Sequence, residues 1–303
     1  KEIPSSFRRS LSQFKPIVLL GGAGSGKSSL VEQHTDWRRQ SEQFFLGHAQ
    51  DPNLQIYLGS RVVIQELSPN LLNNNTKQAR TALQKLWRKL FNHHAPSVVI
   101  VVSATRLPSM TPDALEQLAQ RIRSKINIIS WAIGEPPNVR VALTHTDAIE
   151  GYAEFAQFAD QQGVPLYIKP TSTDAQSLEK AFQEYESYLP LVLEHRAADD
   201  YKKVIRFLRQ APTVFDPLSR FIDDIFCAES LSVHPQLESI YLTSKEFSSV
   251  VSNPFWVDPS QTVIDHSAPL RRHIMYASAI AATLSVTSLV LYGTQRRQWF
   301  EAQ

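Results

Sequence analysis

The sequence predicts an α/β fold in which a mostly parallel sheet is flanked by helices, followed by a C-terminal helical extension and one transmembrane helix, and three observations lead to this prediction. A glycine-rich octapeptide at 21–28 directly follows an apolar run at 16–20. Short apolar runs then alternate with polar, helix-like sequence as far as about residue 197, the order of parallel strands joined by crossover helices. Near the end, residues 274–293 form an uncharged apolar stretch. We therefore expect an α/β domain, a C-terminal helical extension and one transmembrane helix.

The octapeptide fits the pattern G-x-x-x-x-G-K-[ST] without mismatch, which is typical of P-loop NTPases. A turn of this kind directs successive backbone N–H groups toward phosphate oxygens, and the helix that follows adds its unpaired donors. Lys27 is expected to reach the β/γ-phosphates and the Ser28 hydroxyl to bind Mg²⁺. A purely structural glycine turn is the alternative. The residues predicted to bind phosphate are Gly21, Gly22, Ala23, Gly24, Ser25, Gly26, Lys27, Ser28 and Ser29.

The remaining elements follow in chain order. Parallel strands are expected at 16–20, 61–67, 97–102, 138–143 and 165–168, with an antiparallel edge strand at 53–58. Helices are expected at 26–34, 76–92, 111–129, 151–162, 174–193, 200–210 and 215–228. Thr111 and Pro112 supply an N-cap and a proline at the first helical position, and Gly163 ends a helix. A strand-like run at 236–242 comes after the helices.

The apolar stretch at 274–293 has the length that a helix needs to cross a bilayer, about 20 residues. Tyr276 and Tyr292 lie near its ends, where amphipathic rings favour the headgroup region. A buried core helix is the alternative. We predict a juxtamembrane segment, a P-loop domain, a helical extension with a linker, and a membrane helix with its flank. The corresponding ranges are 1–15, 16–197, 198–270 and 271–303.

A P-loop site also needs an acidic residue at the end of a core strand to hold the Mg²⁺ shell. Glu66 ends the strand expected at 61–67 and is the candidate, against an ordinary strand-end carboxylate. In GTPases a glycine N–H three residues later contacts the γ-phosphate, but here that position is Pro69, which has no N–H. We expect no γ-phosphate sensor of that kind.

A candidate base-recognition motif, Thr144-His145-Thr146-Asp147, follows the strand expected at 138–143. The GTPase pattern [NT]-K-x-D places a carboxylate that accepts two hydrogen bonds from guanine, and Asp147 can do this. His145 replaces the usual lysine, and a carboxylate that only caps the next turn is the alternative. We predict base contacts from Thr144, His145, Asp147 and also Ser172, which follows the last expected parallel strand.

Composition limits the setting. The formal net charge of +2 and the interspersed basic residues argue against a nucleic-acid partner. The single cysteine, Cys227, excludes an internal disulfide and suits a reducing compartment in which nucleoside triphosphate is available. We therefore expect residues 1–270 to be cytoplasmic.

Four segments of the chain resemble the cytoplasmic GTPase-like region of the IcmF/TssM proteins, inner-membrane components of bacterial type VI and type IVB secretion systems. The similar segments are 18–30, 57–58, 144–155 and 240–244. The resemblance implies GTP or GDP rather than ATP, Mg²⁺, and a bacterial inner-membrane location. It also implies contacts with membrane lipid, with DotU/TssL-like subunits and with other copies of the chain.

The sequence departs from the family pattern at two places. Glu66-Leu67-Ser68-Pro69 stands where the family commonly has D-T-A-G, and His145 stands where it has lysine. We therefore predict a membrane-anchored structural subunit whose nucleotide-binding domain acts as a switch or docking module, with weak or absent hydrolysis. The alternative is an active membrane-associated GTPase or ATPase that couples hydrolysis to transport or assembly.

Overall fold

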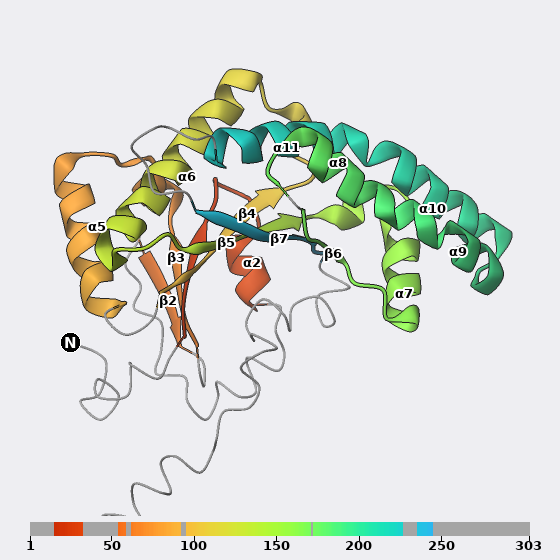
Figure 1. Cartoon of the computed structure of the whole chain (residues 1–303), viewed down its shortest axis with the longest axis horizontal. Helices are drawn as coiled ribbons and strands as arrows, with labels where there is room; N and C mark the ends of the chain where they lie inside the picture. The colour runs from red at the N-terminus through yellow and green to blue at the C-terminus, as the bar shows by residue number, and fades with distance from the viewer. Residues whose placement is uncertain are drawn as a thin grey trace, which may run out of the picture. The chain divides into compact units, whose positions relative to one another are not determined.

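The computed structural model contains a seven-stranded sheet with the strand order β2-β3-β1-β4-β5-β7-β6 (Figure 1). It describes residues 15–32, 54–58, 62–91, 95–170, 172–226 and 235–244. All of them belong to the first of two units into which the chain divides, Lys1–Trp256. The strands are β1 (Lys15–Leu20), β2 (Leu54–Leu58), β3 (Val62–Leu67), β4 (Ser97–Ser103), β5 (Asn138–Thr144), β6 (Tyr167–Ile168) and β7 (Gln236–Leu242).

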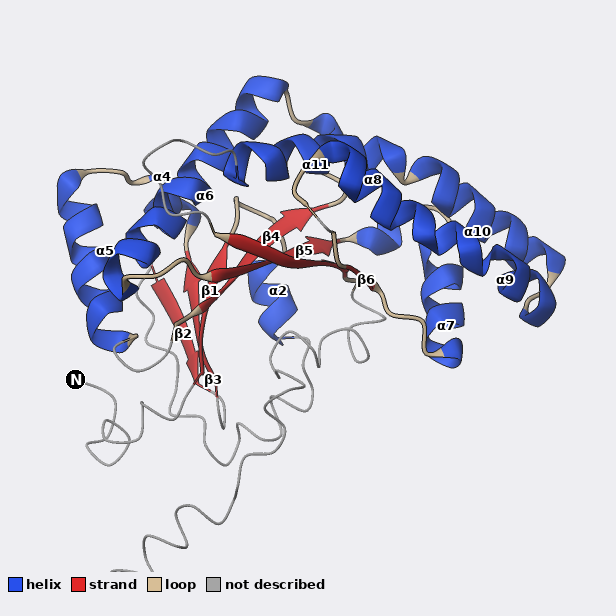
Figure 2. Ribbon diagram, viewed as in Figure 1, coloured by secondary structure: helices blue, strands red, loops and turns tan. Residues whose placement is uncertain are grey.

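Helices flank the sheet, with α6 and α11 along one side of it and α2 on the other (Figure 2). The α-helices are α2 (Lys27–Glu32), α4 (Pro69–Asn73), α5 (Lys77–Leu90), α6 (Pro112–Ile133), α7 (Tyr152–Gln162), α8 (Ala175–Gln183), α9 (Leu189–His195), α10 (Ala198–Gln210) and α11 (Pro212–Phe226). Short 3₁₀ turns are η2 (Leu107–Ser109), η3 (Thr146–Ala148) and η4 (Glu184–Tyr188). The predicted α/β class is confirmed, with a mostly parallel sheet.

The central strands are buried along almost their whole length, as expected for parallel strands covered on both faces. β1 pairs in parallel with both β3 and β4, and β4 pairs in parallel with β5. The carboxyl ends of these strands therefore meet at one edge of the sheet. The antiparallel edge strand expected near 53–58 is confirmed as β2.

The predicted helix signals are confirmed where they are strongest. Thr111 caps α6, its hydroxyl accepting a hydrogen bond from Ala114 N at 3.3 Å, and Pro112 occupies the first turn. Gly163 ends α7 with φ of 67°. The helix expected at 174–193 is instead divided into α8, η4 and α9. Helix α4, which the sequence does not predict, begins at Pro69 behind the N-cap Ser68.

The direction of the strand expected at 165–168 is wrong. β6 has two residues and runs antiparallel to β7. It stops before Lys169-Pro170, where proline has no N–H for a sheet hydrogen bond. β7, the strand-like run at the end of the helical extension, lies between β5 and β6 and is parallel to β5. The late segment of the chain therefore completes the sheet beside β5, the strand that precedes the candidate base-recognition motif.

The helices after residue 197 pack on the same core as the sheet. Phe207 of α10 lies 5.5 Å from Tyr152 and 5.4 Å from Phe155, measured between ring centroids. Phe215 of α11 lies 4.2 Å from Phe182 of α8. The division into a P-loop domain at 16–197 and a helical extension from 198 remains a prediction.

The predicted membrane helix at 274–293 lies outside the described residues. Among the helices of the described residues, none combines the length and the apolar character that crossing a membrane requires.

Candidate phosphate-binding site

The glycine-rich loop joins β1 to α2 at the carboxyl edge of the parallel strands. A Cβ added at Gly21 would lie 2.4 Å from the carbonyl oxygen of Val101, so only glycine fits against β4. Gly26 has a φ of 86°, which favours glycine. The hydroxyl of Ser25 is buried and has no hydrogen-bond partner within the described part of the chain. The loop is thus tightly packed around a buried hydroxyl that lacks a partner among the described residues. A bound phosphate or water would supply that partner.

The ammonium of Lys27 is folded back under this loop. Lys27 Nζ donates hydrogen bonds to Gly21 O at 2.9 Å and to Gly22 O at 3.0 Å. Burial lowers the pKa of Lys27, and the nearby Glu66 carboxylate partly offsets that effect. A cation held by two loop carbonyls inside a buried site is well placed to attract an anion on the loop.

Glu66 is oriented toward the same loop by two hydroxyl groups. Ser28 Oγ donates to Glu66 Oε1 at 2.9 Å, and the Tyr57 hydroxyl donates to Glu66 Oε2 at 3.0 Å. The Glu66 side chain is buried at the end of β3. Hard oxygen donors of this kind fit Mg²⁺, which binds one or two carboxylates and completes its shell with phosphates and water. Ser28 and Glu66 would hold the ion there. Among the described residues there is no group of three or more His, Cys, Asp or Glu side chains that could hold a metal ion.

The structure brings the beginning of the candidate base-recognition motif against the glycine-rich loop. Thr144 Oγ1 donates to Ser25 O at 2.7 Å. His145 Nδ1 lies 3.1 Å from Thr144 Oγ1, and His145 Cε1 would lie 3.2 Å from a Cβ at Gly26. His145 has a left-handed backbone with φ of 57°, which is uncommon for a residue other than glycine and turns the chain sharply after β5.

Asp147 follows in the 3₁₀ turn η3, and its side chain is exposed. The turn is anchored by Thr146, whose buried hydroxyl donates to Thr243 O at 2.8 Å. Asp147 is therefore an exposed carboxylate on an anchored turn, three residues after Thr144, which contacts the glycine-rich loop. That geometry suits recognition of the hydrogen-bond donors of a base.

Ser172 lies in a different environment. Its hydroxyl donates to Asp174 and its backbone N–H donates to Ser177 Oγ at 3.1 Å, both at the start of α8. Since β6 is antiparallel to β7, the chain leaves β6 toward the opposite edge of the sheet from Asp147. The described geometry gives no support to the base contact predicted for Ser172.

Thr243 and Ser244 follow β7, the strand that lies next to β5, at the same edge of the sheet as Thr144. Both are buried. Thr243 N donates to Leu143 O at 2.8 Å. The Thr-Ser pair is visible in the sequence, but its position depends on the insertion of β7 into the sheet, which no local pattern indicates. Arg106, which donates a hydrogen bond to Ala23 O, is a residue that the sequence does not single out.

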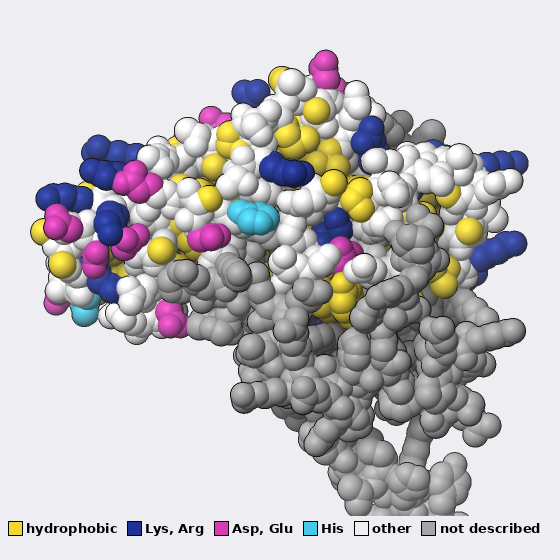
Figure 3. All heavy atoms as spheres, turned by 180° about the vertical axis from the view of Figure 1, so that it is seen from behind, with side chains coloured by type: hydrophobic (Ala, Val, Ile, Leu, Met, Phe, Trp, Pro, Cys, Tyr) yellow, Lys and Arg dark blue, Asp and Glu magenta, His cyan; other side chains and the backbone are white. Residues whose placement is uncertain are grey.

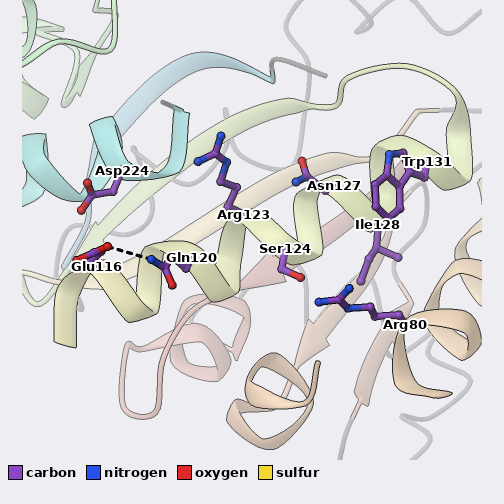
Figure 4. Close-up of a pocket in the computed structure, with 9 residues that line it drawn as sticks. All are labelled: Arg80, Glu116, Gln120, Arg123, Ser124, Asn127, Ile128, Trp131 and Asp224. Carbon is purple, nitrogen blue, oxygen red and sulfur yellow. Dashed lines mark hydrogen bonds between the residues drawn. The ribbon is translucent and has the colours of Figure 1, made fainter. Parts of the chain in front are cut away.

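A cavity of about 450 Å³ lies elsewhere, along α6 between α5 and α11. Figure 4 shows Trp131 and Arg80 at one end of it and Glu116 with Asp224 at the other. None of its lining residues belongs to the predicted site. On the described part of the face in Figure 3, basic and acidic side chains are interspersed.

Comparison with known proteins gives one family. The profile of the IcmF-related N-terminal domain matches residues 76–272, which begins after the glycine-rich loop and includes β7. No curated protein matches the sequence. A solved structure, the signal recognition particle receptor SRb-GDP from Chaetomium thermophilum, is 14% identical, with 44% of this chain and 61% of that chain covered. Its TM-score of 0.26 is too low to establish a common fold.

Proposed function

The chain belongs to the IcmF-related family, whose profile spans residues 76–272, and from this premise we propose that it is a secretion-system subunit with a guanine-nucleotide-binding domain. In this proposal GTP or GDP binds with Mg²⁺ to a P-loop domain of the GTPase type, and the domain acts as a switch or docking module. Hydrolysis is weak or absent.

The observation that carries the proposal is the arrangement of Lys27 and Ser28 at the carboxyl edge of the sheet. Lys27 Nζ is held by Gly21 O and Gly22 O, and Ser28 is hydrogen-bonded to Glu66. One cation and one pair of oxygen ligands are thus organised on the loop that matches the P-loop pattern. When bound, Mg²⁺ would neutralise phosphate charge between Ser28 and Glu66.

The guanine preference rests on Asp147. Its exposed carboxylate accepts but does not donate hydrogen bonds, which suits the N1–H and N2–H donors of guanine and not the edge of adenine. The hydrogen bond from Thr144 to Ser25 O fixes the motif relative to the phosphate loop. A base and its phosphates can therefore be held by the same rigid edge of the sheet.

Weak hydrolysis follows from Pro69. It is the first residue of α4, directly behind the N-cap Ser68, and it has no N–H to offer a γ-phosphate. A domain without a backbone amide at this position cannot use that amide to detect the loss of the γ-phosphate. Such a domain would switch slowly or serve as a permanent docking module. The competing function, active turnover, is favoured by the position of Glu66 next to Ser28.

The family resemblance extends the proposal to location and partners. Residues 274–293 would anchor the chain in the bacterial inner membrane with residues 1–270 in the cytoplasm. DotU/TssL-like subunits and further copies of the chain would be its partners. Retention in the membrane fraction after carbonate extraction is the expected result, and release into the supernatant would contradict the anchor.

Isothermal titration of the whole chain in detergent tests the nucleotide site. We expect GDP and GTPγS to bind with Mg²⁺ more tightly than ADP and ATPγS, and Lys27→Ala to abolish binding. Arg209→Gln, an exposed change on α10, is the matched control. Absence of binding in the wild type, or a preference for the adenine nucleotides, would contradict the proposal.

A further inference from the structure

Arg106 lies on the glycine-rich loop although it comes from a distant segment. Its guanidinium donates to Ala23 O. The Cζ and one terminal nitrogen of the guanidinium would each lie 2.9 Å from a Cβ added at Gly24. The side chain is exposed, so it contacts the loop from the solvent side.

The backbone that carries Arg106 is well fixed. β4 ends at Ser103, Ala104 N donates to Thr144 O at 2.8 Å, and Arg106 N donates to Ser103 O at 3.1 Å. The next residue, Leu107, is buried at the start of η2, which packs against α11. The backbone at Arg106 is therefore held by β4, β5 and α11, and its exposed side chain lies against the glycine-rich loop.

The charge of Arg106 has no acidic partner within the described part of the chain. Among the residues that the structure describes, its side chain makes one hydrogen bond, to a neutral carbonyl, which uses a single donor of a group that has five. Lys27 by contrast uses its ammonium on two carbonyls inside the loop. The loop thus has the buried ammonium of Lys27 on its inner side. On its outer side it has the exposed guanidinium of Arg106, most of whose donors make no hydrogen bond within the described residues.

From this arrangement we propose that Arg106 is a phosphate-contacting residue, which turns from Ala23 O to the phosphates of a nucleotide bound on the loop. The planar guanidinium matches phosphate oxygens in a bidentate manner and keeps its charge at any physiological pH. The inference rests on the proposed nucleotide site and adds to it a second cation from the segment after β4.

The test is titration of the whole chain in detergent with Mg²⁺ and either GDP or GTPγS, at several KCl concentrations. Arg106→Gln keeps a donor for Ala23 O but removes the charge. We expect it to weaken both nucleotides about tenfold or more and to make the affinity less dependent on salt. Arg106→Lys should lose less affinity, since it keeps the charge without the fork. Arg209→Gln should bind as the wild type does.

The outcomes separate this inference from the proposed function. Wild-type binding that Lys27→Ala abolishes and Arg106→Gln leaves unchanged, in affinity and in salt dependence, would overturn the role of Arg106 alone. A wild type that binds neither nucleotide would overturn both. Thermal unfolding without nucleotide checks that the Gln variant folds. If that variant is unfolded, Arg106→Met, which also removes the charge, replaces it, and an unchanged affinity and salt dependence there would refute the contact.

Discussion

Thr144 Oγ1 donates a hydrogen bond to Ser25 O across 2.7 Å, although the two residues are 119 positions apart. This contact joins the end of β5 to the glycine-rich loop after β1. It places a motif suited to reading a base next to a loop suited to holding phosphates. Taken separately, the glycine-rich loop could be a structural turn, and Asp147 could merely cap the turn that follows β5. Because the two segments are in contact, they form one candidate nucleotide site.

Replacing Glu66 by glutamine tests the magnesium site. The change keeps the shape and one acceptor for Ser28 but removes the negative charge, so Mg²⁺ should no longer strengthen nucleotide binding. We expect the affinity for GDP with Mg²⁺ to fall about tenfold or more, while the affinity in EDTA changes little. Titration with and without Mg²⁺ measures both. Glu194→Gln, exposed on α9, is the control, and an unchanged magnesium effect in Glu66→Gln would refute the assignment.

Changing Asp147 to asparagine tests base recognition. An asparagine amide presents a donor where the carboxylate presents only acceptors, so it should disfavour guanine, which has an amino group at C2, and favour xanthine, which has a carbonyl there. We expect GDP affinity to fall and xanthosine diphosphate affinity to rise in direct competition experiments. Asp160→Asn, exposed on α7, should leave the preference unchanged. Equal preference in the wild type and in Asp147→Asn would show that the carboxylate does not contact the base.

Pro69→Ala restores a backbone N–H at the first position of α4 without removing the helix. If Pro69 occupies the place of a γ-phosphate sensor, the new amide should strengthen GTPγS binding relative to GDP by about two- to tenfold. The ratio of the two dissociation constants is the measurement. An unchanged ratio in a folded variant would place Pro69 outside the phosphate site.

The burial of Lys125 leads us to predict that the free energy of unfolding depends on pH, independently of nucleotide binding. Lys125 is buried in α6, donates to Asn74 O at 2.7 Å and to Asn75 Oδ1 at 3.0 Å, and burial together with nearby Arg80 lowers its pKa to about 8. In the unfolded chain the lysine keeps its ordinary pKa of 10.5. Between about pH 8 and that value the unfolded chain therefore binds more protons than the folded chain does. The free energy of unfolding should therefore rise with pH from about 8 to 10.

Denaturant unfolding of wild type and Lys125→Met across that range measures the effect. The wild type should gain about 2 kcal/mol more than the variant between pH 8 and 10. The comparison also cancels Lys27, whose lowered pKa acts in the same direction. Above pH 10 the sign reverses for Tyr152, because burial raises its pKa to about 12 and the unfolded chain then loses its proton first. Lys180→Met, exposed on α8, should behave as the wild type.

Local patterns predicted what depends on local chemistry. The buried β-branched runs gave the strands β1, β3, β4 and β5, and Thr111 and Gly163 marked helix ends because capping needs only neighbouring residues. The order and direction of strands depend on contacts between distant segments. The antiparallel β6 and the insertion of β7 were therefore not predicted.

The same distinction applies to the candidate site. Gly21–Ser28 and Asp147 were predicted from motifs with fixed spacing, and their roles remain predictions. Ser172 was selected by its place after an expected parallel strand, but β6 is antiparallel to β7, so the strand direction on which the selection rested is wrong while the base contact itself stays a prediction. Arg106 contacts the glycine-rich loop from the end of β4, and Thr243 contacts Thr146 from the end of β7, so the place of both beside the candidate site depends on the assembled sheet.

The fate of bound GTP tests the central claim most directly. The whole chain in detergent is incubated with Mg²⁺ and α-labelled GTP, collected on a filter at intervals, and the retained nucleotide is separated by chromatography. The account predicts label that remains GTP over many minutes in the wild type, with none retained by Lys27→Ala. No retention by the wild type, or conversion to GDP that Lys27→Ala abolishes, would contradict it.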